Sequence, residues 1–175
     1  MNRKIKIFIN ENLIKEYSGR MDFAEWFSGS KVIDNSGKPL LLYHGGPKFD
    51  KFRVNETGDY GIYFTDNYHF SLMFAIEYEF YQRDKKDDWD DIPDSEHERW
   101  ENEGEFNTKY LKYSEVKSVY LRMINPIIMD SLDAKLIPNL YDNEHDGVIV
   151  KSTGDHGYKG GQYVVFSDEQ VWLLR

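Results

Sequence analysis

The apolar residues of this chain are grouped in short runs, and this grouping limits the folds that it can adopt. Leu40–Tyr43 is a continuous apolar run bounded by Pro39 and Gly45. Such a run is too short for a buried helix and predicts a buried strand. Short apolar runs and two alternating stretches, 4–9 and 116–123, recur along the chain. We predict strands over residues 4–9, 32–33, 40–43, 61–64, 116–123, 127–129, 148–150 and 162–166, with a closing strand after 167. The pattern indicates a mixed chain with many short strands.

Helical spacing is found in three stretches. Met21–Phe27 is predicted to form a short amphipathic helix. The polar residues 65–67 form an N-cap cluster, and Phe70 and Phe74 follow at helical spacing, which predicts a second helix. Residues 132–141 are predicted to form a short helix broken at its proline.

Length and composition exclude several classes of protein. The 175 residues suffice for one domain with a real core, and the absence of Cys excludes disulfides, a thiol nucleophile and Cys-based metal sites. The five His residues show no metal-ligand spacing, so we expect no metal. Without a long apolar stretch, the chain is expected to be cytoplasmic and not membrane-bound. The net charge of −9 argues against a broad grip on a nucleic-acid backbone.

Residues 83–107 hold most of the negative excess and are treated as an acidic insertion in the single domain 1–175. One interpretation is a solvated segment or a polar helix. The other is a docking surface for a basic partner, or an acidic segment that mimics nucleic acid. Trp89 and Trp100 are unusual for a disordered segment, so we expect a partly ordered lid or a helical hairpin.

Several side chains with chemical potential lie near the first predicted strands. His44 ends the strand 40–43 and precedes two glycines, which allow close approach of a ligand to the backbone. Tyr63 lies in the next strand, and Phe74 lies on the helix that follows. Taken singly, each of these residues is more simply explained as a structural residue. Together, the strand–His-Gly, strand–Tyr and helix start are predicted to face one cleft.

The order of these motifs resembles the NAD-binding half of ADP-ribosyltransferases of the His-Tyr-Glu class. Residues 40–47 (Leu-Leu-Leu-Tyr-His-Gly-Gly-Pro) and 61–66 (Gly-Ile-Tyr-Phe-Thr-Asp) carry the resemblance, which extends over about 28–173. The nearest likeness is to bacterial and phage modules found in polyvalent proteins and toxins. The resemblance implies an α+β fold in which two short sheets pack as a split β-sandwich, with small helices, around an NAD cleft.

The resemblance also implies roles for individual residues. His44 would hydrogen-bond a ribose hydroxyl of NAD+, and Gly45 would offer its backbone to the nicotinamide carboxamide. Tyr63 would stack on the nicotinamide ring, and Phe74 would cover the other face. Ser71 would bond the carboxamide.

The third signature residue falls on Gln162, at the start of the strand 162–166, where much of the family has Glu. An amide keeps a hydrogen bond but gives less stabilisation to an oxocarbenium-like transition state and cannot act as a general base. This favours transfer of a single ADP-ribose. Glu169 is a minor alternative for the carboxylate. Residues 151–161 are predicted to form a Gly-rich loop before this strand.

The resemblance therefore implies a mono-ADP-ribosyltransferase that uses NAD+ as co-substrate. Its expected biological role is that of a toxin or of a phage or defence effector. The acceptor is a macromolecule, either protein or nucleic acid. An antitoxin or a basic partner is a candidate ligand of residues 83–107. Three alternatives stay open: an NAD-binding module with little turnover, an NAD glycohydrolase, and an interaction protein.

Overall fold

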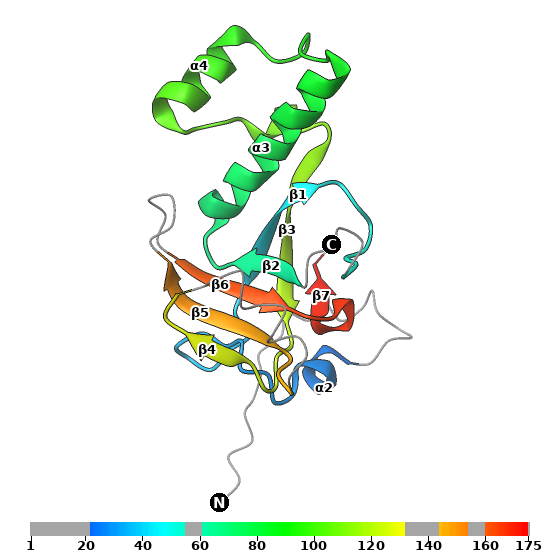
Figure 1. Cartoon of the computed structure of the whole chain (residues 1–175), viewed down its shortest axis with the longest axis vertical. Helices are drawn as coiled ribbons and strands as arrows, with labels where there is room; N and C mark the ends of the chain where they lie inside the picture. Colours follow the sequence, from blue (N-terminus) through cyan, green and yellow to red (C-terminus); the bar gives the residue numbers. More distant parts are fainter. Residues whose placement is uncertain (1–21, 55–60, 132–143, 154–159, 175) are drawn as a thin grey trace, which may run out of the picture.

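The computed structural model describes residues 22–54, 61–131, 144–153 and 160–174 (Figure 1). The predicted strand 4–9 and the predicted helix 132–141 lie outside these residues. The helices are α2 (Phe23–Phe27), α3 (Tyr68–Lys86) and α4 (Asp94–Glu103), with 3-10 turns at Thr108–Tyr110 and Asp168–Gln170. The strands are β1 (Leu42–Pro47), β2 (Ile62–Thr65), β3 (Ser114–Leu121), β4 (Ile127–Met129), β5 (Gly147–Thr153), β6 (Gly160–Val165) and β7 (Val171–Leu173). The fold is α+β, as the sequence predicts.

The strands form one curled sheet in the order β4-β5-β6-β2-β1-β3-β7 (Figure 1). Neighbours are antiparallel except for β4 and β5. The ladder between β1 and β2 consists of the pair Tyr43 and Thr65, whereas β1 pairs with β3 from Leu42 to Pro47. The prediction of two separate sheets is therefore wrong for the described residues, because this one pair joins two sheet halves into one sheet.

Several predicted boundaries differ from the structure, and two of the differences lie beside the cavity described below or in the loop before β6. The strand predicted over 40–43 begins at Leu42 and continues to Pro47, so that His44 lies inside a strand and not at its end. The extension follows from pairing with β3 along the whole of β1. The loop predicted over 151–161 is shorter at both ends, because β5 continues to Thr153 and β6 begins at Gly160.

Helix α3 connects the sheet to the acidic segment. Asn67 caps its start by accepting a hydrogen bond from the Phe70 N–H at 3.1 Å, as the predicted N-cap cluster requires. The helix continues for 19 residues and ends at Asp87, whose φ of 50° is left-handed. It therefore runs well past the predicted apolar stretch and takes in the first residues of the acidic segment.

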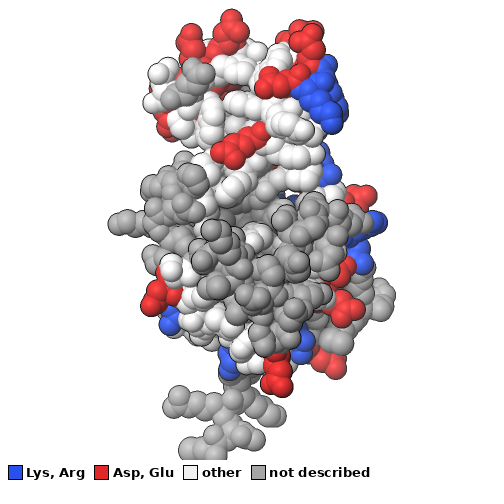
Figure 2. Space-filling model, in the orientation of Figure 1, with Lys and Arg blue, Asp and Glu red and all other residues white. Residues whose placement is uncertain are grey.

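Residues 83–107, called the acidic lobe below, fold into the end of α3, a turn and α4 (Figure 1). Ile76, Ile92 and Phe106 form a small buried cluster under the lobe, and Trp89 and Trp100 pack against it. Figure 2 shows Asp and Glu side chains around this end of the molecule. Of the two predicted forms, the helical hairpin agrees better with this arrangement, and the two tryptophans supply its apolar contacts.

A buried ion pair ties α3 to the chain that follows the lobe. Glu79 and Arg83 have no exposed side-chain surface, and Arg83 Nε donates to Glu79 Oε1 at 2.7 Å. The Glu79 carboxylate also accepts from the backbone N–H groups of residues 112–114, at 2.7–3.0 Å. Arg83 Nη2 donates to the Tyr110 carbonyl at 2.7 Å. One helix turn therefore fixes the path of the chain into β3.

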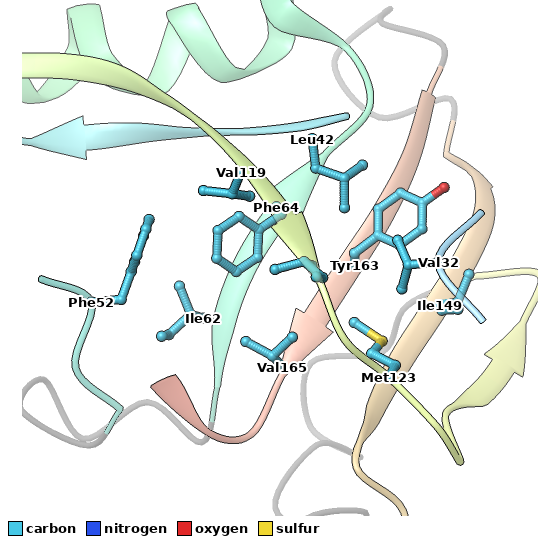
Figure 3. Close-up of a cluster of buried hydrophobic side chains, with 11 residues drawn as sticks. Val32, Leu42, Phe52, Ile62, Phe64, Val119, Met123, Ile149, Tyr163 and Val165 are labelled. Carbon is cyan, nitrogen blue, oxygen red and sulfur yellow. The ribbon is translucent and has the colours of Figure 1, made fainter. Parts of the chain in front are cut away.

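The principal core lies against the face of the sheet that points away from α3. Leu42 of β1, Phe64 of β2 and Tyr163 of β6 converge there with Val119 of β3 (Figure 3). The other buried members of this cluster are Val32, Phe52, Ile62, Leu121, Met123, Ile149 and Val165. Burial of these apolar side chains is the main force that holds the two sheet halves in register.

Candidate functional site

A cavity of about 380 Å³ lies where β1 and β2 part, next to the start of α3. This volume lies within the range of small-molecule pockets, about 300–1,000 Å³. Its walls come from β1, β2, α3 and β6. They are Tyr43, His44, Gly45, Tyr63, Phe64, Thr65, Phe70, Ser71, Phe74 and Gln162.

All six residues named from the sequence line this cavity, although they span 118 positions of the chain from His44 to Gln162. Their chemical roles stay predictions. Sequence reasoning missed four further wall residues, which are Tyr43, Phe64, Thr65 and Phe70. Tyr43, Phe64 and Phe70 are each next to a named residue in the sequence, and Thr65 lies two positions from Tyr63, so the motifs could have suggested them.

Strand register explains why distant residues meet here. Tyr43 pairs with Thr65, and Thr65 pairs with Gln162, so these three lie in one row across β1, β2 and β6. Paired residues share a face of the sheet, and so do residues two apart on one strand. Gly45 and Tyr63 are therefore on that same face, the one covered by α3. The register thus delivers Gln162 to the cavity formed by the first two strands.

His44 occupies the gap left where the β1–β2 ladder stops. Its Nδ1 lies 2.8 Å from the carbonyl oxygen of Tyr63, so the side chain links β1 to β2 where the backbone pairing has ended. A carbonyl only accepts, which makes Nδ1 the donor and leaves Nε2 as the acceptor of the neutral ring. The imidazole packs against the rings of Phe49, Phe52 and Phe64, with ring centroids 5.1–5.9 Å apart, and these contacts fix its plane.

Burial lowers the pKa of His44 below its ordinary value. The ammonium of Lys117 on β3 lowers it further, and the hydrogen bond to the Tyr63 carbonyl acts in the opposite direction. His44 is therefore neutral at pH 7, with a lone pair on Nε2. Such a nitrogen accepts a hydrogen bond from a ligand hydroxyl and does not attract an anion.

The stability of the protein is expected to fall as the pH drops below the ordinary His pKa of 6.5. The unfolded chain protonates His44 there while the native protein does not, so the unfolded state binds more protons and the free energy of unfolding decreases with decreasing pH. His44→Gln should remove this part of the slope. Urea denaturation above and below that pH measures it, and an ordinary pKa for His44 in an NMR titration would contradict it.

Gly45 allows α3 to lie directly on β1. A Cβ on Gly45 would lie 1.7 Å from the carbonyl oxygen of Ser71 and 3.1 Å from the N of Ala75. The sequence prediction gave this glycine a role in close approach of a ligand to its backbone. The structure shows that the absent side chain makes room for the backbone of α3. This contact places Ser71 and Phe74 over the cavity.

The hydroxyl of Ser71 is buried at the cavity wall. The residue is 1% exposed, and its Oγ has no hydrogen-bond partner among the described residues. A buried hydroxyl without a partner costs free energy, typically about 1–3 kcal/mol. A ligand that bonds this oxygen would remove that cost, so Ser71 is a natural polar contact for whatever fills the cavity.

Two aromatic rings in the cavity wall keep surface exposed. Tyr63 is 39% exposed and Phe74 is 43% exposed, although both belong to elements with buried faces. Phe70 is buried and packs edge-on against Phe74, with ring centroids 5.1 Å apart. Exposed rings beside a cavity provide stacking surface for a planar ligand.

No described residue that lines the cavity is Asp or Glu. Gln162 is the residue at the position where the resemblance predicts a carboxylate. Glu169, the minor alternative, lies on the 3-10 turn Asp168–Gln170, where its carbonyl accepts from Trp26 Nε1 at 3.1 Å. Glu169 is not part of the cavity wall, so it cannot replace the carboxylate there.

In the described part of the chain, no cluster of His, Asp or Glu side chains is arranged to hold a metal ion. Among the helices that the structure describes, none is long and apolar enough to cross a membrane. Comparison with known proteins finds no matching family model, no matching curated protein and no matching solved structure.

Proposed function

We propose that the protein is a mono-ADP-ribosyltransferase that cleaves NAD+ and transfers ADP-ribose to a macromolecule. One observation carries the proposal: six residues selected by motif resemblance, from four separate elements, line one cavity. The cavity lies at the opening between β1 and β2, where the resemblance implies an NAD cleft.

The chemistry of the wall fits the nicotinamide end of NAD+. The ring is planar and would stack on Tyr63 and Phe74, which keep exposed surface beside the cavity. The carboxamide needs a donor and an acceptor, and the Ser71 hydroxyl supplies both. Beyond Tyr43 the backbone of β1 has no ladder to β2, and Gly45 in this stretch lines the cavity. Nε2 of His44 would accept a hydrogen bond from a ribose hydroxyl.

The reaction breaks the bond between ribose C1′ and the nicotinamide nitrogen. The bonding electrons leave with neutral nicotinamide, and positive charge develops on the sugar. A nucleophilic atom of the acceptor then bonds C1′ and releases a proton. The protein's residues would hold NAD+ in a strained, oriented pose, and Gln162 would fix a ribose hydroxyl through its amide. With no carboxylate in the described wall, stabilisation of the cationic sugar is weaker than a Glu would give.

The test is incubation of the pure protein with NAD+ labelled in its ADP-ribose part and a cell extract. Tyr63→Ala and His44→Ala are each expected to lower labelling of macromolecules by at least about 10- to 100-fold, the effect of losing one stacking or positioning contact. Tyr81→Ala is the matched control, because Tyr81 is an exposed α3 tyrosine outside the cavity wall. Full labelling by both cavity variants would refute the proposal.

Digestion of the labelled products identifies the acceptor class. Label removed by protease indicates a protein acceptor, and label removed by nuclease indicates a nucleic acid. The net charge of −9 favours a protein acceptor over a polyanion. Cytoplasmic action inside the producing cell, as a toxin or a phage or defence effector, remains part of the proposal.

The absence of a carboxylate from the described wall favours a second candidate, an NAD-binding module with little turnover. Release of free nicotinamide without labelled macromolecules would instead indicate a glycohydrolase. Neither product, with NAD+ bound, would indicate the binding module. The wild-type protein separates these cases, because a slow enzyme releases nicotinamide at a measurable rate and a pure binding module releases none. Gln162→Glu should raise turnover in both cases if the missing carboxylate is what limits it.

A further inference from the structure

The two glycines after His44 have different neighbours, and this difference assigns them different roles. A Cβ on Gly45 would meet the backbone of α3, as described above. Among the described residues, a Cβ on Gly46 would meet only the imidazole of His44, at 3.3 Å from Nε2 and 3.9 Å from Cδ2. The φ of Gly46 is not in the left-handed region, so its backbone conformation does not require glycine.

We infer that Gly46 is a positioning residue for this site, because its missing side chain keeps Nε2 of His44 open to a ligand. His44 and Gly46 are two apart on β1 and therefore share a face of the strand. Nδ1 is already committed to the Tyr63 carbonyl, so Nε2 is the ring's remaining polar atom. It makes no hydrogen bond to a described residue.

A methyl group at position 46 would contact the edge of the imidazole that carries this nitrogen. A separation of 3.3 Å is tighter than nine in ten real Cβ contacts, so the ring would have to tilt or the strand would have to move. Either change removes the straight approach that a hydrogen bond to Nε2 needs. Gly46 would therefore act through His44, and the identity of the ligand as NAD+ rests on the proposed function.

Gly46→Ala tests the inference with two readouts. The dissociation constant for NAD+, measured by calorimetry, is expected to rise about tenfold, the effect of losing one hydrogen bond. The second readout needs no natural ligand: diethyl pyrocarbonate acylates the free nitrogen of neutral imidazoles. Its rate at His44, relative to exposed His69 in the same sample, is expected to fall several-fold in Gly46→Ala. Peptide mass spectrometry measures both sites.

The two readouts separate failure of this inference from failure of the proposed function. If the wild-type protein does not bind NAD+, the proposed function fails, and the acylation rate still decides the role of Gly46. If Gly46→Ala matches the wild type in acylation of His44, the inference is wrong whatever the affinity for NAD+.

A second variant covers the case in which Gly46→Ala folds poorly. In a His44→Ala background the added Cβ loses both neighbouring atoms that it has among the described residues, so Gly46→Ala should cause no further loss of stability there. Equal destabilisation by Gly46→Ala in both backgrounds would show that the glycine serves the backbone and would overturn the inference. Loss confined to the background that keeps His44 would support it.

Discussion

Gly45→Ala is expected to destabilise the protein by about 3 kcal/mol or more, beyond the usual cost of an overpacked core. The added Cβ would lie 1.7 Å from the Ser71 carbonyl oxygen and 2.7 Å from its carbonyl carbon. Both atoms belong to the backbone of α3, so no side chain can rotate away. The helix must move off β1, which also displaces Ser71 and Phe74 from the cavity.

Thermal unfolding followed by circular dichroism measures this effect. For a chain of this size the expected fall in Tm is about 6–12 °C, from about 2–4 °C for each kcal/mol. Gly46→Ala is the matched control, because in the part of the chain that the structure describes its Cβ would meet one imidazole and no backbone. A Tm for Gly45→Ala within the error of the wild type would show that α3 does not lie on β1 as described.

Arg83→Met is expected to lower the free energy of unfolding by about 3–5 kcal/mol, the usual cost of removing one partner of a buried ion pair. The Glu79 carboxylate would stay fully buried without its countercharge. The Tyr110 carbonyl would lose a donor, and Asp91, which accepts from Arg83 at 2.5 Å, would lose its partner. Burial lowers the pKa of Arg83, but its hydrogen bonds to Asp91 and Glu79 outweigh this and raise the pKa, so the guanidinium stays charged.

Urea denaturation followed by tryptophan fluorescence measures this loss, because Trp89 and Trp100 pack in the cluster beneath the acidic lobe. Arg99→Met is the control: Arg99 pairs with Glu96 at 3.3 Å but is 38% exposed, so a change within about 1 kcal/mol is expected. A small effect of Arg83→Met would contradict the description of the pair as buried and structural. Adding Glu79→Leu to Arg83→Met should not restore stability, because the N–H groups of residues 112–114 then lose their acceptor.

The elements of the fold could be predicted where the local pattern decides them. The apolar run at 162–166 corresponds to most of β6, because a short buried strand reads as a continuous apolar segment. The run at 127–129 corresponds to β4, although Ile128 is 56% exposed. Asn67 could be identified as an N-cap because its side chain acts within one turn. The sheet order could not be read this way, since pairing depends on contacts distant in sequence.

The buried ion pair of Glu79 and Arg83 could not be predicted from the sequence, for a physical reason. Glu79 and Arg83 lie on a helix rich in polar residues, where such side chains usually face water. Their burial depends on backbone N–H and carbonyl groups from residues 88–114, which reach the helix only in the folded chain.

The candidate site followed from resemblance and not from periodicity. Singly, Ser71 and Gln162 have no distinguishing feature, and their placement in one wall requires the register of β2 with β6 and the packing of α3 on Gly45. The orphaned hydroxyl of Ser71 and the space before His44 Nε2 are properties of three-dimensional packing alone. Chemical roles remain for experiment to decide.

The single pair between Tyr43 and Thr65 has a mechanical consequence. Elsewhere the sheet is held by longer ladders, so this junction is its weakest seam, reinforced by the bond from the His44 ring to the Tyr63 carbonyl. The cavity opens at the same seam, with His44 and Gln162 in different sheet halves. A molecule that contacts both residues would crosslink the two sheet halves and stiffen the whole sheet. Ligand binding and the rigidity of the fold would therefore depend on the same junction between β1 and β2.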